Sequence, residues 1–263
     1  MNKFWAFNLI GNGTGELILY GDISSETWYG DEITPRQFRE DLDGLGDIED
    51  LVIHINSGGG DVFAGQAIYS TLKQHKAHKT VYVDGIAASI ASVIAMAGDT
   101  VIMPNNATMM IHNAWTLTAG NKHELRKMAD TMEKIDESIV AVYAAKTKLA
   151  VEDIANMMDD ETWLGAQEAI NLGFADKIDE GAKVAASMDG NFLVYNKIKI
   201  DASRYRKRPE IQAKNENKPE TEPPDEGGII LPANGGECQP VEDTETKAQT
   251  ERIWAIRKKI LEV

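Results

Sequence analysis

The segment that decides the fold is LVIHINSGGGDVFAGQAIYSTLKQHK, residues 51–76. It begins with the short apolar run LVIHI, which is typical of a buried strand. The glycine-rich stretch NSGGG follows at residues 56–60, and a helical pattern begins at Asp61. A strand, a glycine turn and a helix in this order predict an α/β unit. Free N–H groups at the start of that helix could receive an oxyanion, although a plain glycine-rich turn is the alternative interpretation.

The alternation of strands and helices continues on both sides of this unit. Strands are expected at residues 16–23, 81–84, 100–104 and 108–112. Thr34 and Pro35 have the residue types of an N-cap and a first helical position. Further helices are expected from about Ser89 and at residues 121–148, 151–158 and 165–172. Residues 1–205 are therefore predicted to form one α/β domain.

Composition excludes several classes of protein. The 263 residues carry 42 acidic and 27 basic side chains, for a formal charge of −15, so a nucleic acid is not expected as a partner. The single cysteine, Cys238, excludes an intramolecular disulfide and a cysteine zinc site. The longest apolar run, residues 86–98, is too short to span a bilayer, and no signal-peptide pattern opens the sequence. We expect a cytoplasmic protein that does not bind membranes.

Composition changes sharply after Tyr205. Six of the eight prolines lie between Pro209 and Pro240, and no aromatic residue occurs from Arg206 to Ile253. Such a segment cannot bury enough apolar surface to offset the entropy of ordering, so residues 206–250 are predicted to be a disordered, acidic, proline-rich linker. Residues 251–263 regain helical spacing and are predicted to form a short C-terminal helix, with a frayed terminus as the alternative.

A second turn, GIAASIAS at residues 85–92, places Ser89 at the expected start of a helix. Small neighbours leave room for a substrate backbone, and the helix dipole would stabilise a developing oxyanion. Ser89 is therefore a candidate nucleophile, although an N-cap serine is the alternative interpretation. Ser92, one helical turn further on, is expected to face away from the site, so that Ser92→Ala would be a mild control.

A serine nucleophile needs a base, and the chain has five histidines. His112 is the best candidate, because it lies where an expected strand enters a loop. His54 is expected to be a core histidine within its strand. The other three, His75, His78 and His123, are expected on the surface.

These turns together resemble the Clp protease proteolytic subunit. The matching blocks are INSGGG (55–60), GIAAS (85–89), MIHN (110–113) and ETWLGAQEA followed by LGFAD (161–169 and 172–176). The resemblance spans roughly residues 17–178. The FWAF opening at residues 4–7, the ETW block and the acidic tail suggest the Clp-like head maturation proteases of phages and prophages as the closest branch.

The resemblance implies an α/β fold of the Clp and crotonase type, a superhelix of repeated strand–strand–helix units. It implies a serine endopeptidase in which Ser89 is the nucleophile, His112 the general base and Glu161 the triad acid, with Asp160 as the fallback. The N–H groups of Gly60 and Ile90 would form the oxyanion hole. No metal or cofactor is required by this chemistry.

The expected role is the processing of scaffold or capsid proteins during phage head maturation, in the host cytoplasm or inside the prohead. The alternative is an ATP-dependent Clp subunit that degrades proteins with a Clp ATPase. A crotonase-type acyl-CoA enzyme and a catalytically silent scaffold protein are less favoured. The helix expected at residues 121–148 resembles the segment that joins Clp rings, so a homo-oligomeric ring is expected. The alternative is that its apolar stripe is buried entirely within one chain.

Overall fold

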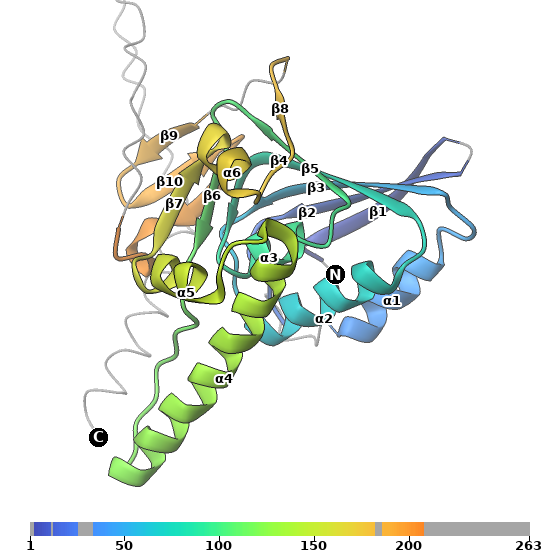
Figure 1. Ribbon diagram of the computed structural model, residues 1–263. Helices are drawn as coiled ribbons and strands as arrows, with labels where there is room; N and C mark the ends of the chain where they lie inside the picture. Colours follow the sequence, from blue (N-terminus) through green and yellow to red (C-terminus); the bar gives the residue numbers. More distant parts are fainter. Residues whose placement is uncertain (1–2, 12, 26–33, 182–185, 208–263) are drawn as a thin grey trace, which may run out of the picture. The chain divides into compact units, whose positions relative to one another are not determined.

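The computed structural model describes residues 3–11, 13–25, 34–181 and 186–207, all of which belong to one compact unit, Met1–Lys214. The expectations for a linker up to residue 250 and for a helix at 251–263 fall, apart from Arg206 and Lys207, outside the described residues. The described part is a mixture of strands and helices (Figure 1), which confirms the predicted α/β class.

An eight-stranded sheet forms the centre of this unit. Its main path runs β1 (Trp5–Gly11), β2 (Thr14–Tyr20), β3 (Asp50–Ser57), β4 (His78–Ala88), β5 (Thr100–Pro104) and β8 (Lys177–Asp179). The β1–β2 pair is antiparallel, whereas β2 to β5 and β8 pair in parallel. Off this path, β6 (Thr108–Ile111) pairs with the end of β4, and β7 (Thr162–Gly165) pairs with β6. The long β4 therefore pairs with β5 near its start and with β6 near its end, and β6 in turn pairs with β7.

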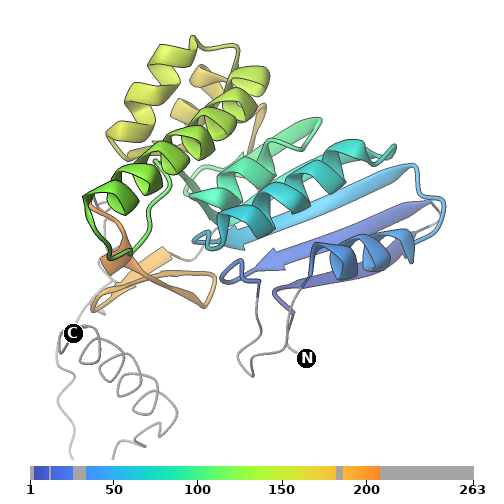
Figure 2. The ribbon, with the colours of Figure 1, turned by 90° about the horizontal axis from the view of Figure 1, so that it is seen from below.

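The described part of the chain has six helices. They are α1 (Pro35–Asp43), α2 (Val62–Gln74), α3 (Ile90–Ala95), α4 (Lys122–Thr147), α5 (Val151–Asp159) and α6 (Ala166–Leu172). Three of them (α1, α2 and α4) begin at an N-cap residue whose side chain accepts a backbone hydrogen bond. Thr34 makes a capping box with Gln37, and Asp61 accepts a hydrogen bond from the N–H of Ala64. Figure 2 shows α1 and α2 side by side on one face of the sheet.

The long helix α4 is buried along only part of its length. Its apolar residues Ile139, Val140 and Tyr143 are buried, whereas Leu125, near the start, is exposed. Figure 1 shows the N-terminal half of α4 projecting away from the sheet. The alternative that its apolar stripe is buried entirely within one chain is therefore wrong.

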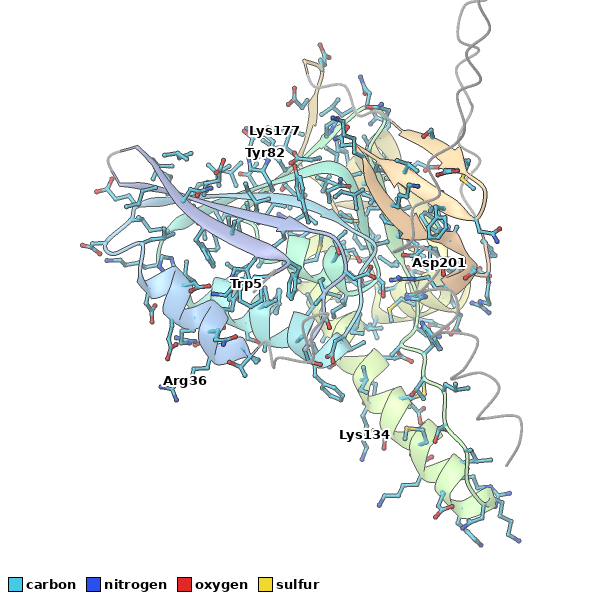
Figure 3. All side chains as sticks on the ribbon, turned by 180° about the vertical axis from the view of Figure 1, so that it is seen from behind. Trp5, Arg36, Tyr82, Lys134, Lys177 and Asp201 are labelled. Atoms are coloured by element: carbon cyan, nitrogen blue, oxygen red, sulfur yellow. The ribbon has the colours of Figure 1, made fainter. Side chains whose placement is uncertain are left out.

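A second, three-stranded sheet follows the main one. It consists of β9 (Ala186–Asp189), β10 (Phe192–Tyr195) and β11 (Ile198–Asp201), in the order β11-β10-β9, and a 3-10 turn (Ala202–Arg204) leads out of it. The side-chain amide of Asn56, at the end of β3, donates to the carbonyl of Tyr195 (2.9 Å) and joins the two sheets. Figure 3 shows Asp201 on this small sheet, viewed from behind, with Tyr82 on the main sheet.

The sequence patterns predicted most of the main sheet but not the second one. Strands β2 to β6 and helices α2, α4, α5 and α6 lie within a few residues of the expected ranges. No strand was expected at the positions of β1 and β7 or after residue 176, so β1, β7 and β8 to β11 are additions. In the part of the chain that the structure describes, no helix has the length and apolarity needed to cross a bilayer.

Candidate active site

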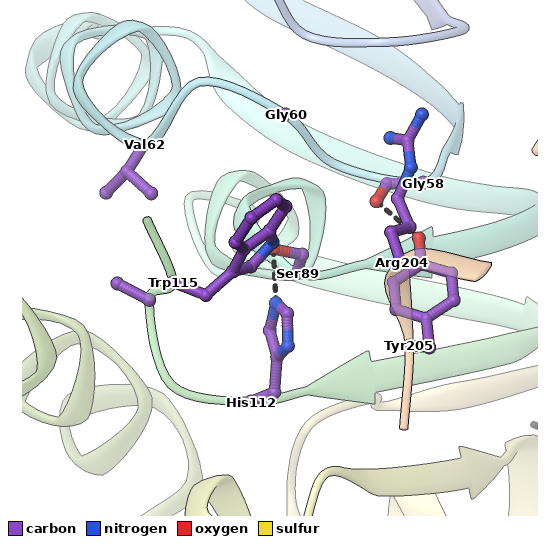
Figure 4. A pocket seen from close by; sticks show the side chains of 9 residues that line it. Gly58, Gly60, Val62, Ser89, His112, Trp115, Arg204 and Tyr205 are labelled. Carbon is purple, nitrogen blue, oxygen red and sulfur yellow. Dashed lines mark hydrogen bonds between the residues drawn. The ribbon is translucent and has the colours of Figure 1, made fainter. Parts of the chain in front are cut away.

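Ser89 lies at the junction between the end of β4 and the start of α3. Its backbone has φ 56° and ψ −132°, which is strained for a residue with a side chain. Ser89 occupies the N-cap position of α3, as the alternative interpretation expected, but its side chain makes no N-cap hydrogen bond. Its Oγ instead lies 2.8 Å from Nε2 of His112 (Figure 4). The strained turn thus directs the hydroxyl at an imidazole and not at the helix backbone.

The pairing of β6 with β4 brings His112 to Ser89. Ala88 on β4 is in register with Met110 on β6, and the N–H of Ser89 donates to the carbonyl of Met110 (2.9 Å). His112 directly follows β6, so its ring lies beside the serine although 23 residues separate them in the sequence. This placement agrees with the expectation that a residue at a strand end is presented to a site.

The electrostatic surroundings of His112 favour its neutral form. Desolvation by burial lowers the pKa of His112 from its ordinary value of 6.5, and the charge of Arg206 lowers it further. The charge of Glu161 acts in the opposite direction and raises this pKa. A neutral imidazole whose Nε2 accepts from the Ser89 hydroxyl can take up its proton.

Glu161 is buried, with 2% of its surface exposed, and its φ of 51° is unusual for a glutamate. Its carboxylate accepts hydrogen bonds from the backbone N–H groups of Arg206 (2.8 Å) and Lys207 (2.5 Å) and a longer one from Trp163 Nε1 (3.4 Å). Among the described residues, it makes no hydrogen bond with His112 and acts on that ring through its charge.

The two neighbouring carboxylates have different surroundings. Asp160, the fallback acid, has a side chain that is 77% exposed and pairs with the ammonium group of Lys207 (3.3 Å). Asp159 accepts a hydrogen bond from the side chain of Asn113 (2.6 Å). Of the three adjacent acids, Glu161 is therefore the only buried one.

The candidate oxyanion donors lie on either side of Ser89. Gly60 has φ 148°, and a Cβ atom added there would lie 1.9 Å from the carbonyl oxygen of Ile23. Ile90 is the first residue of α3, where helical N–H groups have no intrahelical acceptor. In the described part of the chain, neither N–H donates to a protein acceptor. Gly60 lines the cavity at Ser89, and Ile90 directly follows Ser89 in the chain.

A cavity of about 240 Å³ opens at Ser89 (Figure 4). Its lining residues are Gly58, Gly60, Val62, Ser89, His112, Ala114, Trp115, Arg204 and Tyr205. Sequence reasoning did not single out Trp115, Arg204 or Tyr205. Arg204 and Tyr205 come from the end of the second sheet, more than 90 residues after His112, and no local pattern indicates that they return to the site.

Ser92 does not line the cavity, in agreement with the expectation that it faces elsewhere, but it is buried and hydrogen-bonded, so Ser92→Ala is not a neutral control. Its side chain is fully buried, and its hydroxyl lies 2.5 Å from the carbonyl of Ser89 and 3.0 Å from that of Met110. The hydroxyl of Tyr143 lies 2.8 Å away. The reason is that every residue of α3 is buried, so this short helix has no outward face.

The remaining histidines lie elsewhere. His54 is half-buried on β3, where its Nδ1 lies 2.8 Å from the carboxylate of Asp84, in agreement with a core histidine. His78 and His123 are exposed, and His75 ends α2. None of these four rings lines the cavity at Ser89.

Comparison with known proteins identifies the family. The Clp protease family model matches residues 41–182, which include Gly60, Ser89, Ile90, His112 and Glu161. The chain belongs to the Clp protease family. Its strand and helix order agrees with the Clp and crotonase-like fold that the sequence resemblance implied. The second sheet and the segment after it lie beyond the matched range.

Three relatives describe the similarity further. The chain is 31% identical over 140 residues to the ATP-dependent Clp protease proteolytic subunit of Deinococcus radiodurans, covering 52% of this chain and 68% of the relative. It is 32% identical over 131 residues to subunit 3 of Rhodococcus jostii, covering 49% and 65%. It is 32% identical over 134 residues to the subunit of Oltmannsiellopsis viridis, covering 49% and 68%. These matches do not show the special closeness to head maturation proteases that the sequence suggested.

Proposed function

We propose that this chain is a serine endopeptidase of the Clp type, with Ser89 as the nucleophile and His112 as the general base. The observation that carries the proposal is the 2.8 Å contact between Ser89 Oγ and His112 Nε2 in a cavity at a strained turn. A serine hydroxyl is a weak nucleophile unless an adjacent base removes its proton. Membership of the Clp protease family also supports the assignment as a peptidase.

The proposed mechanism begins with attack of Ser89 Oγ on the scissile carbonyl as His112 takes the hydroxyl proton. The carbonyl oxygen becomes an oxyanion, which the N–H groups of Gly60 and Ile90 would receive. His112 then donates its proton to the leaving amine. In the second half of the reaction His112 takes a proton from the water that attacks the acyl-enzyme and gives it to Ser89 Oγ as the acyl bond breaks. In each step the imidazolium is stabilised by the nearby negative charge of Glu161.

Glu161 is proposed as the acid in preference to Asp160. Its charge raises the pKa of His112, and its burial keeps this interaction from being screened by solvent. The exposed side chain of Asp160 is directed to Lys207 instead. A carboxylate has about four acceptor positions, so the three hydrogen bonds of Glu161 leave one for the ring of His112.

The proposed setting is an ATP-dependent Clp protease, in which a ring of identical subunits works with a Clp ATPase. This alternative is favoured over head maturation because all three relatives carry that name. The exposed Leu125 and the half-buried Met128 and Met132 on α4 offer an apolar surface to another copy of the chain. The processing of capsid or scaffold proteins rests on the sequence resemblance alone.

Cleavage of an unstructured protein such as casein tests the catalytic proposal. Ser89→Ala should reduce the rate by roughly four orders of magnitude while the circular dichroism spectrum stays unchanged. Substantial cleavage by purified Ser89→Ala protein would contradict the assignment. Parallel pull-downs with a Clp ATPase and with a capsid protein distinguish the two settings, and the proposal expects capture of the ATPase.

A further inference from the structure

The segment 204–207 contacts the catalytic centre although it lies beyond the range that the family model matches. It follows the second sheet, whose strands hold it in place: the N–H of Tyr205 donates to the carbonyl of Ala202 (3.3 Å), and Ala202 in turn donates to Asn191 (2.8 Å). Arg204 is fixed by two hydrogen bonds to the carboxylate of Asp22, both 3.0 Å. The segment is thus anchored before it reaches the site.

Tyr205 connects this segment to the glycine turn. Its hydroxyl donates to the carbonyl of Gly58 (2.7 Å), two residues before the proposed oxyanion donor Gly60. Burial raises the pKa of Tyr205, so the hydroxyl stays protonated and remains a donor. Three consecutive glycines leave this turn with few side-chain contacts of its own. Ile23 and Ser57 hold the turn at Gly59 and Asp61, and the tyrosine adds a restraint at Gly58.

The Tyr205 ring also packs on the histidine side of the site. It makes edge-to-face contacts with His112, at 6.3 Å between ring centroids, and with Trp163, at 5.2 Å. Trp163 in turn donates to Glu161. One side chain thus contacts both the glycine turn and the base.

The next two residues hold the proposed acid. The N–H groups of Arg206 and Lys207 both donate to the carboxylate of Glu161. Glu161 has a strained backbone and a buried charge, and such a group is stable only when its surroundings compensate for both. Two backbone donors from one anchored segment provide that compensation and fix the direction of the carboxylate.

We propose that residues 205–207 form a positioning clamp for catalysis, in which Tyr205 fixes the oxyanion turn and the N–H groups of Arg206 and Lys207 fix Glu161. The proposal rests on the proposed peptidase function. It assigns a role in the reaction to a segment outside the matched family range. None of the three residues acts on substrate atoms in this scheme. Tyr205 acts through the glycine turn at Gly58, and the other two act through Glu161.

Two full-length variants with matched controls test the two halves of the clamp. Tyr205→Phe keeps the ring and removes the hydroxyl. Arg206→Pro removes one N–H donor, and the extended backbone of Tyr205 (φ −111°, ψ 142°) is the conformation that a following proline requires. Arg206→Ala is its control, because it loses the same guanidinium but keeps the N–H.

Peptide cleavage with separate determination of kcat and KM provides the readout for the oxyanion turn. Tyr205→Phe should lower kcat about tenfold with KM changed by less than about twofold, since complete loss of an oxyanion donor costs about a hundredfold or more. The acidic limb of the pH–rate profile of Tyr205→Phe should lie at the same pH as that of the wild type. If Tyr205→Phe only unfolded part of the protein, the number of active sites counted by fluorophosphonate titration would fall. The kcat per active site and the KM would then stay as in the wild type.

The acid half of the clamp has a different signature. The charged groups that act on His112 are Glu161 and Arg206, while Arg204 is neutralised by Asp22. Both Arg206 variants lose the same guanidinium, so any difference between them reports on the N–H. Arg206→Pro should have a kcat about tenfold below that of Arg206→Ala and an acidic limb at lower pH, because a less fixed Glu161 raises the pKa of His112 less.

The outcomes separate this proposal from the proposed function. A wild-type protein that neither cleaves peptides nor reacts with a fluorophosphonate overturns the peptidase assignment and the clamp with it. The clamp alone is overturned if the wild type is active, Tyr205→Phe has the kcat and pH profile of the wild type, and Arg206→Pro has those of Arg206→Ala. A rate increase in either variant also overturns it, because the segment would then restrain the enzyme.

Discussion

Ser92 lies directly behind the proposed nucleophile, with its hydroxyl 2.5 Å from the carbonyl oxygen of Ser89. A serine hydroxyl has one hydrogen, and that of Ser92 is shared between the carbonyls of Ser89 and Met110. The oxygen of Ser92 therefore accepts a hydrogen bond from the hydroxyl of Tyr143. Both side chains are buried. The turn that strains Ser89 is therefore tied to α4 through a buried hydroxyl pair.

Ser92→Ala should destabilise the fold by about 1–3 kcal/mol, because it leaves the buried Tyr143 hydroxyl without an acceptor. Thermal unfolding followed by circular dichroism measures the effect. The double variant with Tyr143→Phe is the control and should recover part of the loss, since both polar groups are then removed. A Ser92→Ala protein as stable as the wild type would show that the pair contributes nothing.

Gly60→Ala should abolish activity and lower stability. An added Cβ would lie 1.9 Å from the backbone carbonyl oxygen of Ile23, and φ 148° is unfavourable for alanine. Gly11→Ala is the matched control, because nothing lies within 4 Å of its added Cβ. Casein cleavage and thermal unfolding check both variants. Wild-type activity in Gly60→Ala would mean that this turn does not hold the oxyanion donor.

His54 should make stability dependent on pH. Its hydrogen bond to Asp84 raises the pKa of His54 above the value of about 6.5 that it has in the unfolded chain. The stabilisation is therefore fully present below about pH 6.5 and is lost as the pH rises through the folded-state pKa. His54→Gln should lower the melting temperature more at about pH 5.5 than at about pH 8.5. His123→Gln, on the exposed first turn of α4, should have little effect at either pH, and equal losses for His54→Gln at both would refute the linkage.

Glu161→Gln should cut the rate of peptide cleavage by roughly two to four orders of magnitude. The charge of Glu161 raises the pKa of His112, so its removal should also move the acidic limb of the pH–rate profile to lower pH. Asp160→Asn and Asp159→Asn should remain near the wild type. If Asp160→Asn is the variant that loses activity, the assignment of the acid is off by one residue; if none loses it, Ser89 and His112 act as a dyad.

The sequence predicted those parts of the molecule whose signals are local. Asn121 at the start of α4 and Thr34 at the start of α1 are cap residues that the structure places at those positions. The turns containing Ser89 and His112 were recognisable because each follows an apolar strand. The pairing of β4 with β6 that joins them follows from the fold class and needed the structure for its distances.

The rest depends on contacts between distant parts of the chain. The strands β9 to β11 have only four residues each, too few for a clear alternating pattern. The hydrogen bond between Tyr205 and Gly58 spans 147 residues, and no spacing rule predicts it. The burial of Ser92 was not foreseen because a helix was assumed to have an outward face, whereas every residue of the short α3 is buried.

Labelling with a fluorophosphonate, followed by mass spectrometry of the intact protein and of its peptides, tests the central claim most directly. The Ser89–His112 pair predicts one adduct per chain, located on Ser89, with none on Ser89→Ala and much slower labelling of His112→Ala. The labelling rate of the wild type should fall as the pH drops through the lowered pKa of His112. An unlabelled wild-type protein, or an adduct that persists in Ser89→Ala, would contradict the account.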